Sequence, residues 1–152
     1  MIIVFQRVQR ASVTIAAEIT ASIGPGALLL LGVEREDTRA DAEALVRKIL
    51  DLRVFPGARP MDRSVQDLGG ALLVVSQFTL AGRVDKGRRP SFEYAASPER
   101  AEPLYQHFIE HARSSGLVVE AGRFGADMQV SLVNDGPVTL LMRARDGTVR
   151  SL

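Results

Sequence analysis

The segment Ser76-Gln77-Phe78-Thr79-Leu80 carries side chains that could take part in ester chemistry. It follows the apolar run 71–75, so a hydroxyl, an amide and a second hydroxyl leave the end of a buried strand, a common position for a binding site. Backbone N–H groups at residues 78 and 79 could stabilise an oxyanion there. Taken alone, the same residues could equally well cap the edge of a sheet.

The chain lacks the residues that usually identify a nucleophile and its base. It has no Gly-x-Ser-x-Gly motif, no cysteine, and only two histidines, His107 and His111. The pattern His107-Phe108-Ile109-Glu110-His111 resembles a zinc-protease motif and places both imidazoles on one helix face. A third ligand is not evident, so we expect two solvated histidines and no metal. A glycine motif that would cradle a nucleotide is also absent, and we expect no cofactor.

A second polar segment, Asn134-Asp135-Gly136-Pro137-Val138-Thr139, lies between two apolar stretches. Gly-Pro at such a position is by default an ordinary turn. A cis bond there is uncommon, because only about 5% of X-Pro bonds in folded proteins are cis.

A basic loop follows the first segment. It holds four cations and one acid: Arg83, Lys86, Arg88, Arg89 and Asp85. Such a loop is by default a solvated surface, but its position after Thr79 suits the binding of phosphates. Since the net charge of the chain is only +1, contact with a nucleic acid would depend on a local patch of this kind.

The apolar pattern predicts the elements that would position these groups. With 152 residues, 46% hydrophobic and 24% charged, the chain suits one globular domain, 1–152. We expect an α/β fold with a mixed, partly barrel-like sheet and two main helices packed on it. The expected helices span about 37–52 and 97–112, and the tail after about 143 is expected to fray. Strands are expected at 2–15 (two short strands, with a hairpin near 16–18), 27–33, 53–55, 71–78, 117–120, 128–133 and 138–142.

Nothing in the sequence indicates targeting or a membrane. The first residues lack the features of a signal peptide, and the longest apolar run, 27–31, is far too short to span a bilayer. The absence of cysteine suits a reducing cytosol. We therefore expect a cytoplasmic protein with no membrane partner.

Taken together, four segments resemble the D-aminoacyl-tRNA deacylase family. They are 6–13, 76–80, 86–92 and 134–139, they occur in the family's order, and the resemblance covers about residues 1–142. It implies an enzyme that hydrolyses the ester of D-aminoacyl-tRNA, and of mischarged glycyl-tRNA, while sparing L-aminoacyl-tRNA. The implied partners are the tRNA acceptor end carrying a D-amino acid or glycine, and a second copy in a homodimer, with no DNA. The turn at 16–17 and the tail after Met142 depart from relatives.

The resemblance also implies roles for individual residues. Gly136 and Pro137 would form a cis bond, enter the partner's pocket and present backbone carbonyls to the α-amino group and Cα of the substrate. Lys86, Arg88 and Arg89 are expected to bind tRNA phosphates. The pocket for the aminoacyl ester and terminal adenosine would be lined by Ser76, Gln77, Phe78 and Thr79, with Phe124 and Met128 beside it.

The missing base suggests a mechanism. Backbone N–H groups of Phe78 and Thr79 would stabilise the oxyanion, at about 3–4 kcal/mol per well-placed donor. The neighbouring ribose hydroxyl would help to activate water. Three alternatives stay open: Thr79 as a covalent nucleophile, a non-enzymatic RNA-binding dimer, and a metallohydrolase using His107 and His111.

Overall fold

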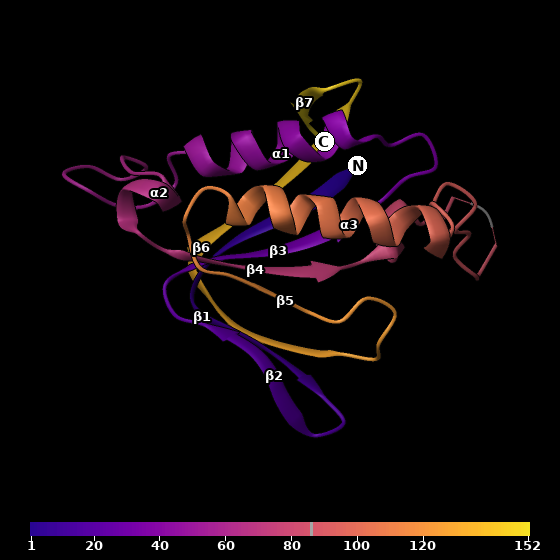
Figure 1. Cartoon of the computed structure of the whole chain (residues 1–152), viewed down its shortest axis with the longest axis horizontal. Helices are drawn as coiled ribbons and strands as arrows, with labels where there is room; N and C mark the ends of the chain where they lie inside the picture. Colours follow the sequence, from indigo (N-terminus) through magenta and orange to yellow (C-terminus); the bar gives the residue numbers. More distant parts are fainter. Residues whose placement is uncertain (86) are drawn as a thin grey trace.

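Seven strands form one mixed sheet in this computed structural model, which describes residues 1–85 and 87–152. The strand order is β5-β4-β3-β1-β6-β7, and β2 pairs with β1 beside this path. The pairs β3–β4 and β4–β5 are parallel, and the remaining pairs are antiparallel. Helices α1 and α3 cover the same face of the sheet (Figure 1). The expected α/β class, with a mixed sheet and two main helices, is confirmed.

Most of the expected strands and helices are present, with slightly different bounds. The strands are β1 (Ile2–Ile15), β2 (Glu18–Ile23), β3 (Gly26–Gly32), β4 (Ala71–Ser76), β5 (Val119–Ala121), β6 (Gln129–Arg145) and β7 (Thr148–Ser151). The helices are α1 (Arg39–Asp51), α2 (Val65–Leu68), the 3-10 turn η1 (Phe78–Ala81) and α3 (Pro98–Arg113). Thr38 caps α1 and Pro98 opens α3, as expected. The expected strand at 53–55 is reduced to a single bridge between Phe55 and Arg63.

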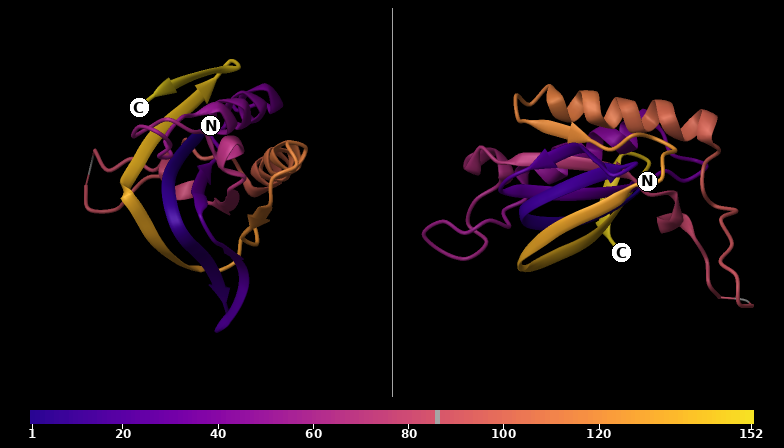
Figure 2. Two further views of the ribbon diagram at one scale, coloured as in Figure 1. Left: turned by 90° about the vertical axis from the view of Figure 1, so that its left-hand side faces the viewer. Right: turned by 90° about the horizontal axis from the view of Figure 1, so that it is seen from below.

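Two hydrophobic clusters lie on opposite faces of the central strands. Leu29 packs toward α1 and α3 in the larger cluster, with Leu45 and Phe108. Its neighbour Leu28 points the other way, into a smaller cluster with Val13 of β1 and residues of β2 and β4. This alternation is the two-residue period of a strand. The second cluster lies inside the curved part of the sheet, where β1, β2 and β6 bend away from the helices (Figure 2).

The two short strands expected within 2–15 form one long strand, β1, and the strands expected at 128–133 and 138–142 form one long strand, β6. β1 runs unbroken through 14 residues, and β6 through 17 residues, including Gly136 and Pro137. The two strands pair along most of their length, which stabilises both as continuous elements. The Gly136–Pro137 bond is cis, which confirms what the resemblance implies.

The expected fraying of the tail, 144–152, is wrong. β6 continues to Arg145, and β7 returns beside it as the second strand of a hairpin. Asp146 and Gly147 form the turn, both with positive φ, at 52° and 70°. Asp-Gly is among the sequences that favour such a two-residue turn. The turn at Ala16 and Ala17 has the same left-handed backbone, although neither residue is glycine.

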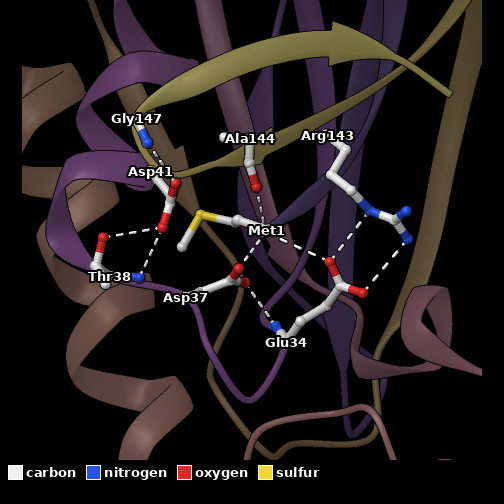
Figure 3. A network of polar contacts seen from close by, with 8 residues as sticks. All are labelled: Met1, Glu34, Asp37, Thr38, Asp41, Arg143, Ala144 and Gly147. Carbon is white, nitrogen blue, oxygen red and sulfur yellow. Dashed lines mark hydrogen bonds and ion pairs between the residues drawn. The ribbon is translucent and has the colours of Figure 1, made fainter.

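A buried polar network joins β1, α1 and the C-terminal hairpin (Figure 3). The α-ammonium group of Met1 is fully buried, forms an ion pair with Asp37, and donates to the carbonyl of Ala144 at 2.8 Å. Asp41 accepts hydrogen bonds from the N–H of Thr38 at 2.8 Å and from the N–H of Gly147 at 2.9 Å. Asp41 therefore caps α1 and anchors the hairpin turn at the same time.

Replacing Asp41 with asparagine is expected to lower the free energy of unfolding by about 2 kcal/mol at pH 7, because hydrogen bonds to a buried charge are lost. Burial by itself raises the pKa of Asp41, but the N–H of Gly147 and the N–H and hydroxyl of Thr38 outweigh it, so the pKa lies below 3.8. The stability that the ionised carboxylate provides is thus full above pH 3.8 and is lost as pH falls through the lowered pKa.

Urea denaturation at pH 7 and at pH 3 or below measures this loss. The difference between wild type and Asp41→Asn should shrink at the acidic pH, and an equal difference at both would contradict the prediction. Asp67 holds the same position in the capping box of α2, on an exposed surface. Asp67→Asn is therefore the matched control and should have the smaller effect.

Among the described residues, no helix is both long and apolar enough to cross a membrane.

Candidate active site

A cavity of about 610 Å³ opens at the carboxyl ends of β3 and β4. Because these strands are parallel, their carboxyl ends meet at one edge of the sheet. One wall comes from the start of α3, and the opposite wall from the connection between β5 and β6. The cavity brings together five of the residues that the sequence predicted: Ser76, Gln77, Phe78, Phe124 and Met128.

The turn η1 begins where β4 ends and presents Phe78 at the rim. The N–H of Gln77 donates to the carbonyl of Leu31 at 2.8 Å, which ties the start of the turn to β3. Gly32 makes this close approach possible: a Cβ there would lie 2.9 Å from the carbonyl oxygen of Gln77 and 3.0 Å from the Cβ of Leu80. The ring of Phe78 is 57% exposed and packs edge-on against Phe92, with ring centres 5.0 Å apart.

Thr79 lies on η1 but does not line the cavity. Its hydroxyl oxygen accepts a hydrogen bond from the Gln77 amide at 2.5 Å, and the described residues provide no other partner for it. Neither histidine lines the cavity. His107 pairs instead with Glu43 of α1 at 2.9 Å, and the rings of His107 and His111 are stacked 6.2 Å apart. Within the part of the chain that the structure describes, no group of three His, Cys, Asp or Glu residues is placed to hold a metal ion.

Two titratable side chains of the cavity wall were not singled out from the sequence. Tyr105 is buried, and its hydroxyl lies 3.0 Å from the carbonyl oxygens of both Val74 and Gly122. Burial raises the pKa of Tyr105 above its usual range, so the hydroxyl stays protonated and able to donate. The spacing of Tyr105 in the apolar stripe of α3 predicts only a core residue. Its hydrogen bonds to the two carbonyls are not evident from the sequence, although a buried tyrosine usually needs a polar partner. Asp127 is exposed at the rim, between Phe124 and Met128.

Gly136 and Pro137 lie on a different part of the surface. They line a shallow groove with Arg7 and residues 56–61, none of which lines the cavity. Within one chain the structure therefore does not bring Gly136 and Pro137 together with Ser76 and Phe78.

A bulge in β6 lifts Gly136 and Pro137 out of the sheet. Gln6 pairs with Thr139, but Val8 pairs with Asn134, so β1 advances by two residues where β6 advances by five. The extra residues cannot all pair with β1 and must project from the ladder. Gly136 has a φ of +113°, a conformation that favours glycine.

Two side chains hold the bulge from either side. Arg7 forms an ion pair with the carboxylate of Asp135 at 2.9 Å, and its guanidinium also donates to the carbonyl of Asp135 at 3.2 Å. Asn134 donates to the carbonyls of Arg7 at 2.9 Å and Val138 at 3.1 Å. Both residues belong to the segments that carry the resemblance, but the sequence alone did not show that they support the bulge.

The basic loop is described only in part. Lys86 lies outside the described residues, and Arg88 and Arg89 are exposed. Backbone hydrogen bonds between Arg83 and Ser91 close the base of the loop. The guanidinium of Arg83 lies 4.9 Å from the ring centre of Tyr94, a cation–π contact.

Comparisons with known proteins identify similar sequences and folds. Residues 4–143 match the family model described as D-Tyr-tRNA(Tyr) deacylase. A D-aminoacyl-tRNA deacylase of Symbiobacterium thermophilum is 56% identical over 140 residues, which cover 91% of this chain and 93% of that protein. A D-aminoacyl-tRNA deacylase of Klebsiella pneumoniae is 52% identical over 144 residues, covering 94% and 99%.

Two solved structures share the fold. One, described as c-Myc DNA Unwinding Element Binding Protein, has a TM-score of 0.89 and 45% identity, and the match covers 95% of this chain and 99% of that one. The other, described as a probable eukaryotic D-amino acid tRNA deacylase, has a TM-score of 0.82 over 92% of this chain and 97% of that one. Its 16% identity supports the likeness in fold alone.

Proposed function

The chain belongs to the D-Tyr-tRNA(Tyr) deacylase family, hydrolases that remove D-amino acids from tRNA, and on this premise we propose that main-chain atoms of Gly136 and Pro137 select the hand of the substrate. The observation that carries the proposal is the bulge in β6. It exposes a short stretch of backbone without a side chain at Gly136, and Arg7 and Asn134 fix its position.

The bulge would act on a second copy of the chain. Gly136 and Pro137 lie outside the cavity of their own chain, so they can approach a bound ester only in a partner's cavity. We therefore propose a homodimer in which each bulge completes the other subunit's site. In that arrangement, the carbonyls of residues 136 and 137 would face the α-amino group and Cα of the bound amino acid.

Phe78 and Thr79 would supply the oxyanion site. Because η1 begins at Phe78, the first N–H groups of the turn have no acceptor within it; the first internal donor is Leu80, whose N–H bonds to the carbonyl of Gln77. Phe78 lines the cavity and Thr79 follows it on η1, and each of the two N–H donors could stabilise a tetrahedral oxyanion by about 3–4 kcal/mol. The oxyanion forms when water attacks the ester carbonyl, and its collapse releases the ribose hydroxyl.

The attacking water would be activated with help from the neighbouring ribose hydroxyl. The Thr79 hydroxyl is hydrogen-bonded to the Gln77 amide, and among the described residues no carboxylate or histidine is hydrogen-bonded to it as a base that would make it a nucleophile. Thr79 thus positions the rim together with Gln77. In this scheme the RNA supplies part of the chemistry, and the protein supplies the geometry.

Steric exclusion explains both what is rejected and what is accepted. An L-amino acid would direct its side chain into the fixed backbone of the bulge, and a thousandfold discrimination requires about 4 kcal/mol, a reasonable cost for such a clash. Glycine has no side chain to collide with the bulge. Glycyl-tRNA is therefore proposed as a second substrate.

The tRNA would reach the site through its acceptor end. Arg88, Arg89 and Lys86 follow η1 in the chain and would bind phosphates beside the cavity. We propose a cytoplasmic location, which suits a charged tRNA as substrate and a chain without cysteine.

Hydrolysis of D-tyrosyl-, L-tyrosyl- and glycyl-tRNA, with and without a chelator, tests the proposal. We expect the D-tyrosyl and glycyl esters to be cleaved, the L-tyrosyl ester to be cleaved about a thousandfold more slowly, and the chelator to have no effect. Equal cleavage of both enantiomers would rule out selection by the bulge. Resistance of glycyl-tRNA even at high enzyme concentration would rule out pure exclusion. Binding without release of amino acid would indicate a non-enzymatic dimer, and inhibition by the chelator a metallohydrolase.

A further inference from the structure

The C-terminal hairpin presents three arginines on one face. Arg143 pairs directly with Arg150, and Arg145 pairs with Thr148. Directly paired residues point to the same face of an antiparallel sheet, as do residues two apart on one strand. These four side chains therefore share a face, where they line a hollow of about 480 Å³ together with Asp146, Ser151 and Leu152. The opposite face of the hairpin, with Ala144 and Val149, packs on the core.

The charges on this face are only partly balanced. Arg143 pairs with Glu34, with its Nε 3.2 Å from a carboxylate oxygen. Across the described part of the chain, no carboxylate lies within 4.0 Å of Arg145 or Arg150. Like charges placed directly opposite each other on neighbouring strands are destabilising unless an anion neutralises them. Planar guanidinium groups bind phosphate with two parallel hydrogen bonds, and the hydroxyl of Thr148 on the same face adds a donor nearby.

The polar network of Figure 3 fixes the hairpin in place. The N–H of Gly147 in the turn donates to Asp41 of α1, and the carbonyl of Ala144 accepts from the buried α-ammonium of Met1. Because the backbone is held at these points, Arg145 and Arg150 extend from a defined surface and not from a frayed tail. Less ordering entropy is then lost when an anion binds.

The hairpin lies at the same edge of the sheet as the cavity. One row of paired residues crosses the sheet from Ser76 through Leu31, Ile3 and Met142 to Ser151. Four steps of about 4.8 Å give a span of roughly 19 Å along the sheet. This is about the length of six stacked nucleotides at 3.4 Å each. The basic loop and β7 lie on the side of the sheet opposite α3 (Figure 2), whereas the hairpin turn is bonded to α1 through Asp41.

We propose that the C-terminal hairpin is a second tRNA contact, in which Arg145 and Arg150 bind backbone phosphates of the acceptor stem while the acceptor end occupies the cavity. This inference rests on the proposed function, because it takes tRNA as the polyanion. Residues 144–152 lie outside the residues that match the family model, so the contact adds to the shared site. It would stabilise the bound tRNA without touching the ester.

The double variant Arg145→Gln with Arg150→Gln tests the contact, because both side chains are exposed and their loss leaves the core intact. The KM for D-tyrosyl-tRNA should rise roughly fivefold with kcat unchanged, since two exposed ionic contacts are lost. The slope of log kcat/KM against log salt should become shallower by about 1.8, or 0.9 for each lost phosphate contact. Hydrolysis of D-tyrosyl-adenosine, which lacks the acceptor stem, should not change.

A matched control removes two cations elsewhere. Arg47→Gln with Lys48→Gln changes two exposed residues of α1, on the helix-covered face, and should leave KM and the salt slope unchanged. The inference is wrong if the hairpin variant keeps the wild-type KM and slope, if hydrolysis of D-tyrosyl-adenosine falls equally, or if sedimentation shows that only the oligomeric state has changed.

Binding of uncharged tRNA separates this inference from the proposed function. If the wild type releases no amino acid but the hairpin variant binds tRNA more weakly, the proposed function fails and the hairpin contact stands. If the wild type cleaves D-tyrosyl-tRNA and the variant binds tRNA normally, the hairpin contact fails and the proposed function stands.

Discussion

Replacing Gly136 with alanine is expected to lower kcat/KM for D-tyrosyl-tRNA by about a hundredfold, as expected when catalytic geometry is displaced by about 1 Å. The new Cβ would lie 2.7 Å from a guanidinium nitrogen of Arg7 and 3.1 Å from the backbone nitrogen of Val138. Gly136 also has a φ of +113°, which alanine rarely adopts. The bulge must therefore shift, and Arg7 must leave the position from which it holds Asp135. Single-turnover hydrolysis, with enzyme in excess of substrate but well below saturation, would measure the loss in kcat/KM.

Gly116→Ala is the matched control for this change. Gly116 also has a positive φ, +83°, but a Cβ added there would meet nothing within 4 Å, and the residue lies just beyond α3. It should cost about 1 kcal/mol of stability, the usual penalty for alanine in a left-handed conformation, and leave hydrolysis nearly unchanged. Full activity of a folded Gly136→Ala protein would show that the position of the bulge does not matter for the reaction.

Replacing Gly32 with alanine is expected to reduce hydrolysis by roughly tenfold to a hundredfold, since small displacements of positioning groups have effects of this size. The added Cβ would lie 2.9 Å from the carbonyl oxygen of Gln77, and backbone cannot rotate away as a side chain can. Relief requires η1 to move, and with it the N–H groups of Phe78 and Thr79. Since the proposed defect is in the oxyanion site, kcat should fall more than KM rises.

Gly24→Ala is the matched control for Gly32→Ala, because Gly24 lies just before β3 and Gly32 is the last residue of that strand. A Cβ at Gly24 meets nothing within 4 Å, and the residue is exposed in the turn before β3. Its kcat should match that of the wild type. If Gly32→Ala folds and keeps the wild-type kcat, the N–H groups of η1 are not the oxyanion donors. Loss of discrimination between D- and L-esters, with kcat retained, would instead place η1 in substrate selection.

Local pattern placed Ser76, Gln77 and Phe78 at the end of a buried strand, but the family resemblance was needed to predict that they line a pocket. The apolar run 71–75 and the polar residues after it required only that a buried strand end at Ser76, and parallel pairing with β3 then placed this end at the sheet edge. Phe124 and Met128 came from the family resemblance, because nothing in their local sequence indicates that the β5–β6 connection folds over the cavity.

The bulge in β6 and the contacts of Tyr105 depend on pairing between segments far apart in the chain, so the sequence did not show them. The bulge exists only because β1 and β6 pair on both sides of it, and neither segment alone reveals that register. Tyr105 has the spacing of a core residue, and only the fold shows two carbonyls beside its hydroxyl. The C-terminal hairpin is a different case: Asp146-Gly147 is a turn signal in the sequence, but the polar residues around it resemble those of a frayed tail.

β3 and β4 are shared by the two hydrophobic clusters, with Leu29 and Val74 in one and Leu28 and Leu73 in the other. Neither cluster can open without releasing these strands, so their amides should exchange with solvent only when the whole domain unfolds. The rim residues Gln77 and Phe78 follow directly after the end of β4, the strand whose amides are expected to exchange most slowly. The proposed selection between mirror-image substrates would therefore depend on the cooperativity of the entire fold, and mutations far from the cavity that loosen either cluster are expected to weaken it.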